Sequence, residues 1–120
     1  MANEQSTAAQ SSPQKPTVGR IVHYRLSAID AENINRRRTS GASIAERLKS
    51  EPPTWPAGAQ AHIGNGATAG EVFPLVVVRV HDEPHLTVNG QVLLDGNDQL
   101  WVTSAGEGTE NGTWSWPPRA

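Results

Sequence analysis

The chain has 120 residues, of which 36% are hydrophobic, with no cysteine and a formal net charge of −2. This length and hydrophobic content suffice for one modest core. The lack of cysteine excludes disulfides and thiolate zinc sites, and the near-neutral charge argues against a protein that mainly coats nucleic acid. Because the sequence has neither an apolar run of transmembrane length nor a signal peptide at its start, we expect a cytoplasmic protein.

The composition changes after the first residues. Residues 1–17 are small and polar, include two prolines, and hold too few apolar groups to offset the entropy of ordering. We therefore expect a flexible N-terminal arm over 1–17 and a single β-rich domain over 18–120.

A strand and then helical segments are expected in the first half of the domain. Residues 18–26 alternate in polarity, as in a half-buried strand. The residues on its apolar face are Val18, Val22, Tyr24 and Leu26. Residues 27–38 open with a capping serine and end in three arginines, which predicts a short helix. A serine and a glutamate three residues apart predict a second helical turn over 43–49.

The second half reads mainly as strands. Prolines and glycines make 51–70 a long irregular connection, whereas the apolar run 72–80 is typical of a strand covered on both faces. After a turn at 81–85, the alternation of 86–94 continues through Gly90, so we favour one strand with Gly90 at a bulge or bend over an Asn-Gly hairpin.

A turn, a further strand and a glycine-rich loop lead to the end of the chain. The turn is 95–98, the strand is 100–104 and the loop is 105–112. The closing strand carries Trp114 and Trp116 on one face. This order predicts a mainly β (α+β) fold, namely a small barrel or rolled antiparallel sheet of about five strands with one or two short helices inserted after strand 1.

Most candidate chemistry has a simpler explanation. His81 and His85 lie four apart, but Pro84 prevents the helix that would bring them onto one face, so no metal site is expected. No nucleophile elbow or phosphate-binding loop is present. Asp95 and Asp98 belong to a sequence that a hairpin turn requires on backbone grounds. We expect no enzyme and no cofactor.

Two groups of residues are candidates for ligand binding. Arg36, Arg37 and Arg38 form the one dense charge cluster, which suits phosphates or carboxylates but also a solvated helix end. Tryptophan supplies most of the aromatic area and offers stacking platforms. The candidates are Trp101, Trp114 and Trp116. For Trp114 and Trp116, a place in the core and a place at an interface both remain open.

Four blocks of sequence are distinctive. They are residues 18–24 (VGRIVHY), 73–80 (FPLVVVRV), 89–96 (NGQVLLDG) and 112–117 (GTWSWP). Together they resemble a family of short proteins from tailed bacteriophages that begin with a Gly-Arg-Ile-Val-His-Tyr strand and end in Gly-Thr-Trp-His-Trp-Pro. Ser115 replaces the usual histidine, and Gly90 replaces the usual apolar residue. The resemblance implies a phage origin and supplies no activity.

These observations predict a non-enzymatic bacteriophage accessory protein. The first hypothesis is an oligomeric binding protein that sequesters a small host-made ligand such as a nucleotide immune signal, with tryptophan stacking on a base and arginine holding phosphates. The alternatives are a virion structural protein, as a capsid decoration or tail-associated protein, and an inhibitor that binds a host protein. The expected partners are other copies of the chain, a nucleotide-type ligand, or capsid and tail proteins, without membrane, DNA or RNA. The expected location is the host cytoplasm or, for the virion alternative, the virion.

Overall fold

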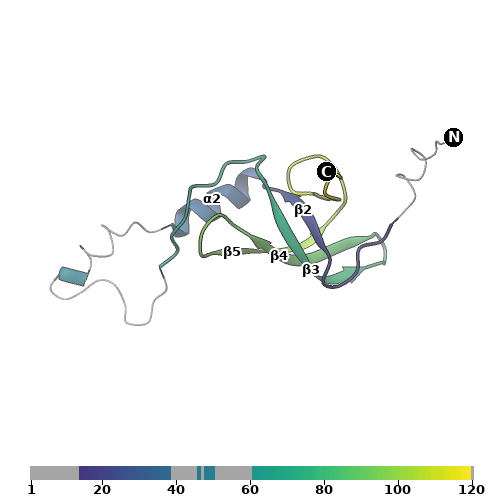
Figure 1. Cartoon of the computed structure of the whole chain (residues 1–120), viewed down its shortest axis with the longest axis horizontal. Helices are drawn as coiled ribbons and strands as arrows, with labels where there is room; N and C mark the ends of the chain where they lie inside the picture. Colours follow the sequence, from purple (N-terminus) through teal and green to yellow (C-terminus); the bar gives the residue numbers. More distant parts are fainter. Residues whose placement is uncertain (1–13, 39–45, 47, 51–60, 120) are drawn as a thin grey trace.

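A computed structural model describes residues 14–38, 46, 48–50 and 61–119 of the chain (Figure 1). The predicted arm over 1–17 lies outside the described residues except for its last part, 14–17. Most of the predicted second helical turn, over 43–49, and the first half of the predicted connection, over 51–60, also lie outside them. The described half of that connection, 61–70, forms only isolated bridges, as an irregular segment should.

The fold is one antiparallel sheet of five strands in the order β5-β4-β3-β2-β6 (Figure 1). The strands are β2 (Ile21–Arg25), β3 (Val72–His81), β4 (Thr87–Leu93), β5 (Gln99–Ala105) and β6 (Trp114–Ser115). The sheet is not closed, because β5 and β6 do not pair as strands. The prediction of a mainly β rolled sheet with a short helix after the first strand is therefore confirmed, in its rolled-sheet form rather than as a barrel.

The helix α2 (Ala28–Arg37) follows β2 and is fixed to it by a capping box. The Asp30 N–H donates to Ser27 Oγ at 3.0 Å, and the Ser27 N–H donates to Asp30 Oδ2 at 3.0 Å. The same carboxylate accepts the Tyr24 hydroxyl at 2.6 Å. Burial of Tyr24, its hydrogen bond to Asp30 and the charge of that carboxylate raise the pKa of the phenol well above its ordinary value. One aspartate thus starts the helix and attaches it to the sheet.

The core occupies one face of the sheet. The alternate residues of each strand turn inward, and Ile34 of α2 packs among them. The fully buried side chains include Val22, Leu26, Ile34, Leu75, Val77, Val88, Val92 and Trp114. Trp114 is the largest of them, so the closing strand supplies the greatest single area to the core.

Two details of the predicted strands are wrong. The first strand begins at Ile21 rather than at Val18, because the Arg20 N–H donates to Thr17 O at 3.0 Å and Gly19 has a φ of 93°, which together make a turn. Val18 is exposed there, while the other three residues of the predicted face are buried as expected.

The second correction concerns β3, which we expected to be covered on both faces. Its inward residues Leu75 and Val77 are buried, but Val78 is 46% exposed and Val72 is also exposed. The described residues supply only one covering layer, so the outer face of this apolar strand meets solvent.

The prediction of one strand through Gly90 is confirmed. β4 runs unbroken, and its pairing with β3 and with β5 shifts register next to Gly90, between Val77 and Arg79 and between Val88 and Gly90. Gly90 is buried, and a Cβ built there would lie 2.4 Å from Val76 O and 2.5 Å from Leu75 Cδ2. Close backbone approach of β3 therefore requires glycine at this position.

Gly90→Ala should lower the free energy of unfolding by about 1–3 kcal/mol, the usual cost of forcing a methyl group into a packed core. Gly106→Ala is the matched control, because a Cβ at Gly106 meets nothing within 4 Å. Urea unfolding of both variants measures the difference, and equal stabilities would contradict the close packing of β3 on β4.

Candidate functional site

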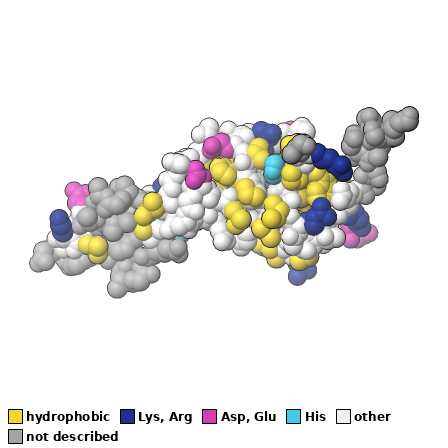
Figure 2. Space-filling model, in the orientation of Figure 1, with side chains coloured by type: hydrophobic (Ala, Val, Ile, Leu, Met, Phe, Trp, Pro, Cys, Tyr) yellow, Lys and Arg dark blue, Asp and Glu magenta, His cyan; other side chains and the backbone are white. Residues whose placement is uncertain are grey.

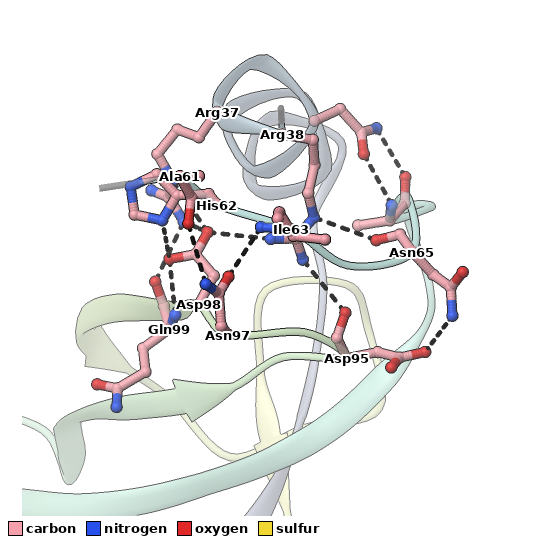
Figure 3. Close-up of polar contacts among 12 residues, drawn as sticks. Arg37, Arg38, Ala61, His62, Ile63, Asn65, Asp95, Asn97, Asp98 and Gln99 are labelled. Carbon is pink, nitrogen blue, oxygen red and sulfur yellow. Dashed lines mark hydrogen bonds and ion pairs between the residues drawn. The ribbon is translucent and has the colours of Figure 1, made fainter. Parts of the chain in front are cut away.

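The arginines at the end of α2 converge on one carboxylate (Figure 3). Arg37 donates from Nε and Nη2 to Asp98 Oδ2 at 3.2 and 2.8 Å, and Arg38 donates from Nη1 to the same oxygen at 3.3 Å. The Asp98 side chain is only 7% exposed. We call Arg37, Arg38, Asp98 and the neighbouring His62 the Asp98 clamp.

The second oxygen of Asp98 is also engaged. The Gln99 N–H donates to Asp98 Oδ1 at 2.8 Å, and His62 Nδ1 lies 3.4 Å from the same oxygen. This imidazole forms an ion pair with Asp98 only when it is protonated, and within the described part of the chain its Nδ1 has no hydrogen-bond partner. Burial alone would raise the pKa of Asp98, but the hydrogen bonds from Arg37 and Gln99 and the charges of Arg37 and His62 outweigh it and hold that pKa below its ordinary value.

The clamp joins three segments that are distant in sequence. Arg37 Nη2 donates to Gln99 O at 3.1 Å, and Arg38 Nε donates to Asn65 O at 3.2 Å. Isolated bridges pair Arg38 with His62 and Gly64 with Gly96.

Asn97 adds a second set of contacts, since it accepts the Ile63 N–H at 2.8 Å and donates to Ala61 O at 2.9 Å (Figure 3). The end of α2, residues 61–65 and the turn before β5 therefore form one polar unit.

The contacts with Asp98 occupy two of the three arginines that the sequence predicts as ligand-binding residues. Arg37 and Arg38 already serve an internal carboxylate, so an incoming phosphate would compete with Asp98 for them. Arg36 lies exposed in the last turn of α2. The structure thus brings Arg37 and Arg38 together and gives them a structural task.

Trp114 and Trp116 form a pair at the other edge of the sheet. Trp114 is fully buried, and its ring meets that of Trp116 edge to face with centroids 5.5 Å apart. Trp116 packs on the margin of the core, and the Arg20 guanidinium lies 4.9 Å from its ring centroid. Of the two places that the sequence leaves open, the core is therefore the place of Trp114.

Trp101 lies apart from that pair, on the outer face of β5. It is 48% exposed, whereas its neighbours Leu100 and Val102 are buried. Across the sheet the ladder pairs Trp101 with Gln91, Gln91 with Val76, and Val76 with Ile21. Because side chains alternate along each strand, these residues share the face that points away from the core.

We call this outer surface of the sheet the open face. Its exposed apolar residues are Ile21, Val72, Val78, Leu93 and Trp101. Figure 2 shows hydrophobic side chains gathered over the strands, with both basic and acidic side chains around the margin of the group. The five strands contain no Asp or Glu, while they carry Arg25, Arg79, His23 and His81. The open face therefore combines exposed apolar residues with neutral polar ones such as Gln91, and the charged residues of its strands are basic.

The sequence predicts some of these residues and not others. It places Asp98 in a turn and indicates no role for His62 or Arg20, because their contacts join segments 36 or more residues apart. The signal it passed over is the charge pattern of the strands, in which arginine and histidine occur but carboxylates do not.

Comparison of the chain with protein-family models, with curated proteins and with solved structures finds no match. The resemblance to short phage proteins thus stays a prediction. Among the described residues, no group of three or more His, Asp and Glu side chains is placed to hold a metal ion. No helix in the described ranges is both long and apolar enough to span a membrane.

Asp98→Asn should lower the free energy of unfolding at neutral pH by about 2 kcal/mol, the size of hydrogen bonds to charged groups. Since the pKa of Asp98 is lowered in the folded protein, its stabilisation is complete above the unfolded carboxyl pKa of about 3.9 and is lost as pH falls through the folded value. Urea unfolding at neutral and acid pH should show the gap between wild type and Asp98→Asn closing in acid.

The control for this experiment is Asp95→Asn, an exposed position in the same turn. It should change stability little at either pH. A gap for Asp98→Asn that stays constant into acid would contradict a charged clamp.

Proposed function

We propose that this chain is a non-enzymatic accessory protein of a bacteriophage that docks a protein partner on its open face. The partner surface is apolar at its centre and carries carboxylates at its margin. The observation that carries the proposal is the half-exposed Trp101, which lies on a sheet face with four other exposed apolar residues and on strands without any acidic residue.

The composition of β3 supports a second covering layer. Strands that are apolar on both faces are typical of sheets covered on both sides. In β3 the inner face is covered by the core, but Val72 and Val78 on the outer face are exposed. Contiguous exposed apolar residues on a single subunit mark interaction surfaces. A docked partner would supply the cover that the described residues do not.

The charges indicate the chemistry of the partner. Arg25 and Arg79 lie on strands that carry no acid, so carboxylates at the margin of a partner would find opposite charge. Tryptophan is enriched among the residues that dominate interface energies, and Trp101 is the large aromatic side chain on this face. Trp101 is therefore the proposed anchor, with the arginines giving orientation and faster association.

The identity of the partner separates the two protein-binding alternatives that the sequence raised. A capsid or tail protein would make the chain a virion component, and a host protein would make it an inhibitor. Sequestration of a nucleotide is less well supported, because phosphates would have to displace Asp98 from Arg37 and Arg38.

A photo-crosslinking residue at position 101, in cells that produce the protein during phage infection, should capture one protein other than the chain itself, which mass spectrometry identifies. Binding of that purified protein is then measured to two variants. Trp101→Glu should raise the Kd by about 30-fold or more, as expected for a central tryptophan. Ile29→Glu, at a more exposed apolar residue on α2, should leave the Kd unchanged.

Three results would oppose docking on the open face. These are equal cross-linking from position 29, wild-type affinity in Trp101→Glu, and the absence of any cross-link from position 101 to a protein other than the chain itself. A nucleotide that binds the wild type, still binds Trp101→Glu and is lost in Arg37→Ala would favour sequestration of a ligand instead.

A further inference from the structure

The strand β5 forms one edge of the sheet, and its outward backbone groups can be identified. The Leu94 N–H donates to Asp98 O at 3.3 Å, so these two residues occupy a hydrogen-bonded position of the ladder between β4 and β5. In an antiparallel ladder such pairs recur at every second residue, which turns the backbone of Leu100 and Val102 toward β4. The N–H and C=O groups of Gln99, Trp101 and Thr103 therefore point away from the sheet.

The first of these outward residues, Gln99, is hydrogen-bonded to the Asp98 clamp through its backbone. The Gln99 N–H donates to Asp98 Oδ1 at 2.8 Å, and Gln99 O accepts from Arg37 at 3.1 Å. Both contacts confirm that the Gln99 backbone faces outward. At the other end, Ser104 has a φ of 53°, and the extra residue of β5 near it ends the regular ladder. The free edge is thus the stretch around Trp101 and Thr103.

The opposite edge of the sheet is covered by the chain itself. The Trp114 N–H donates to Gly106 O at 2.9 Å, and the Gly108 N–H donates to Trp114 O at 2.9 Å. Among the described residues nothing similar covers β5, where β4 is the one paired strand. Natural edge strands are usually protected by charges or proline. β5 contains neither, since its sequence is Gln-Leu-Trp-Val-Thr-Ser-Ala.

We propose that β5 pairs with β5 of a second copy of this chain, antiparallel and centred on Val102. In this register Trp101 of each copy lies opposite Thr103 of the other. Both N–H and both C=O groups of the free stretch then find a partner, while Gln99 keeps its contacts within the clamp. A second β5 fits this edge, because a two-fold axis sets the outward N–H groups of one copy opposite the outward C=O groups of the other.

The antiparallel pairing also determines on which side of the combined sheet the two open faces lie. Antiparallel pairing in one continuous sheet places the two-fold axis perpendicular to the sheet, so both open faces lie on the same side. The two Trp101 side chains become diagonal neighbours across the seam, about 7–8 Å apart. Pairing of the edges therefore leaves the open face accessible and extends it, and the inference does not depend on the proposed function of that face.

The first test is the oligomeric state, measured by analytical ultracentrifugation over a dilution series. The wild type should be a dimer that dissociates on dilution. Thr103→Pro removes an outward N–H without breaking the ladder to β4 and should abolish the dimer. Thr103→Lys, a milder change at the same exposed position, sets like charges near each other across the seam and should raise the dimer Kd about tenfold or more.

Val78→Lys is the matched control, because it places the same charge on the open face but on β3, two strands from the edge. It should leave the dimer intact. A monomeric wild type, an intact dimer in both Thr103 variants, or a dimer lost in Val78→Lys but kept in Thr103→Lys would each overturn edge pairing, the last in favour of stacked open faces. Circular dichroism verifies that each variant is folded.

The second test addresses the register. Val102 would face its own copy across the axis at about 4.5 Å between Cα atoms, a separation that a disulfide accepts. Since the chain has no cysteine, Val102→Cys should give a cross-linked dimer on mild oxidation. Val92→Cys, a buried valine on the adjacent strand β4, should not. Cross-linking of both variants alike, or of neither, would contradict a pair centred on Val102.

Discussion

Burial of a single face of the sheet is the constraint from which the other features follow. One helix and the closing tryptophan cover the inner side, with Ile34 and Trp114 fully buried against the inward residues of the strands. In a chain of this size the burial of apolar side chains supplies most of the stability. The same strands carry apolar residues outward, so the sheet that forms the core also leaves apolar side chains exposed on its outer face.

The Asp98 clamp sets one end of the free edge of β5. By holding the end of α2 against the turn before β5, it satisfies the outward backbone groups of Gln99 and determines where the free edge begins. The charge arrangement explains why a dense arginine cluster need not mark a ligand site. A buried carboxylate requires cations nearby, and Arg37 and Arg38 supply them.

The sequence was sufficient for the fold class but not for the site. Local patterns predict α2 from its capping serine and β4 from its unbroken alternation, and both signals depend on near neighbours. The contacts of Asp98 with His62 and Arg37 and the stacking of Arg20 on Trp116 join distant segments, so no local pattern reveals them. Two signals misled: the alternation around Val18, where a turn precedes the first strand, and the apolar run of β3, which predicts two covering layers although the described residues supply one.

The most direct test of one-sided burial is fluorine NMR of protein labelled with 5-fluorotryptophan, with signals assigned by replacing each tryptophan with phenylalanine. The shift between H₂O and D₂O reports the contact of each indole with solvent. One-sided burial predicts a clear isotope shift for Trp101 and none for Trp114, with an intermediate value for Trp116. A Trp101 signal as insensitive to solvent as that of Trp114, in protein without any partner, would contradict burial of a single face of the sheet.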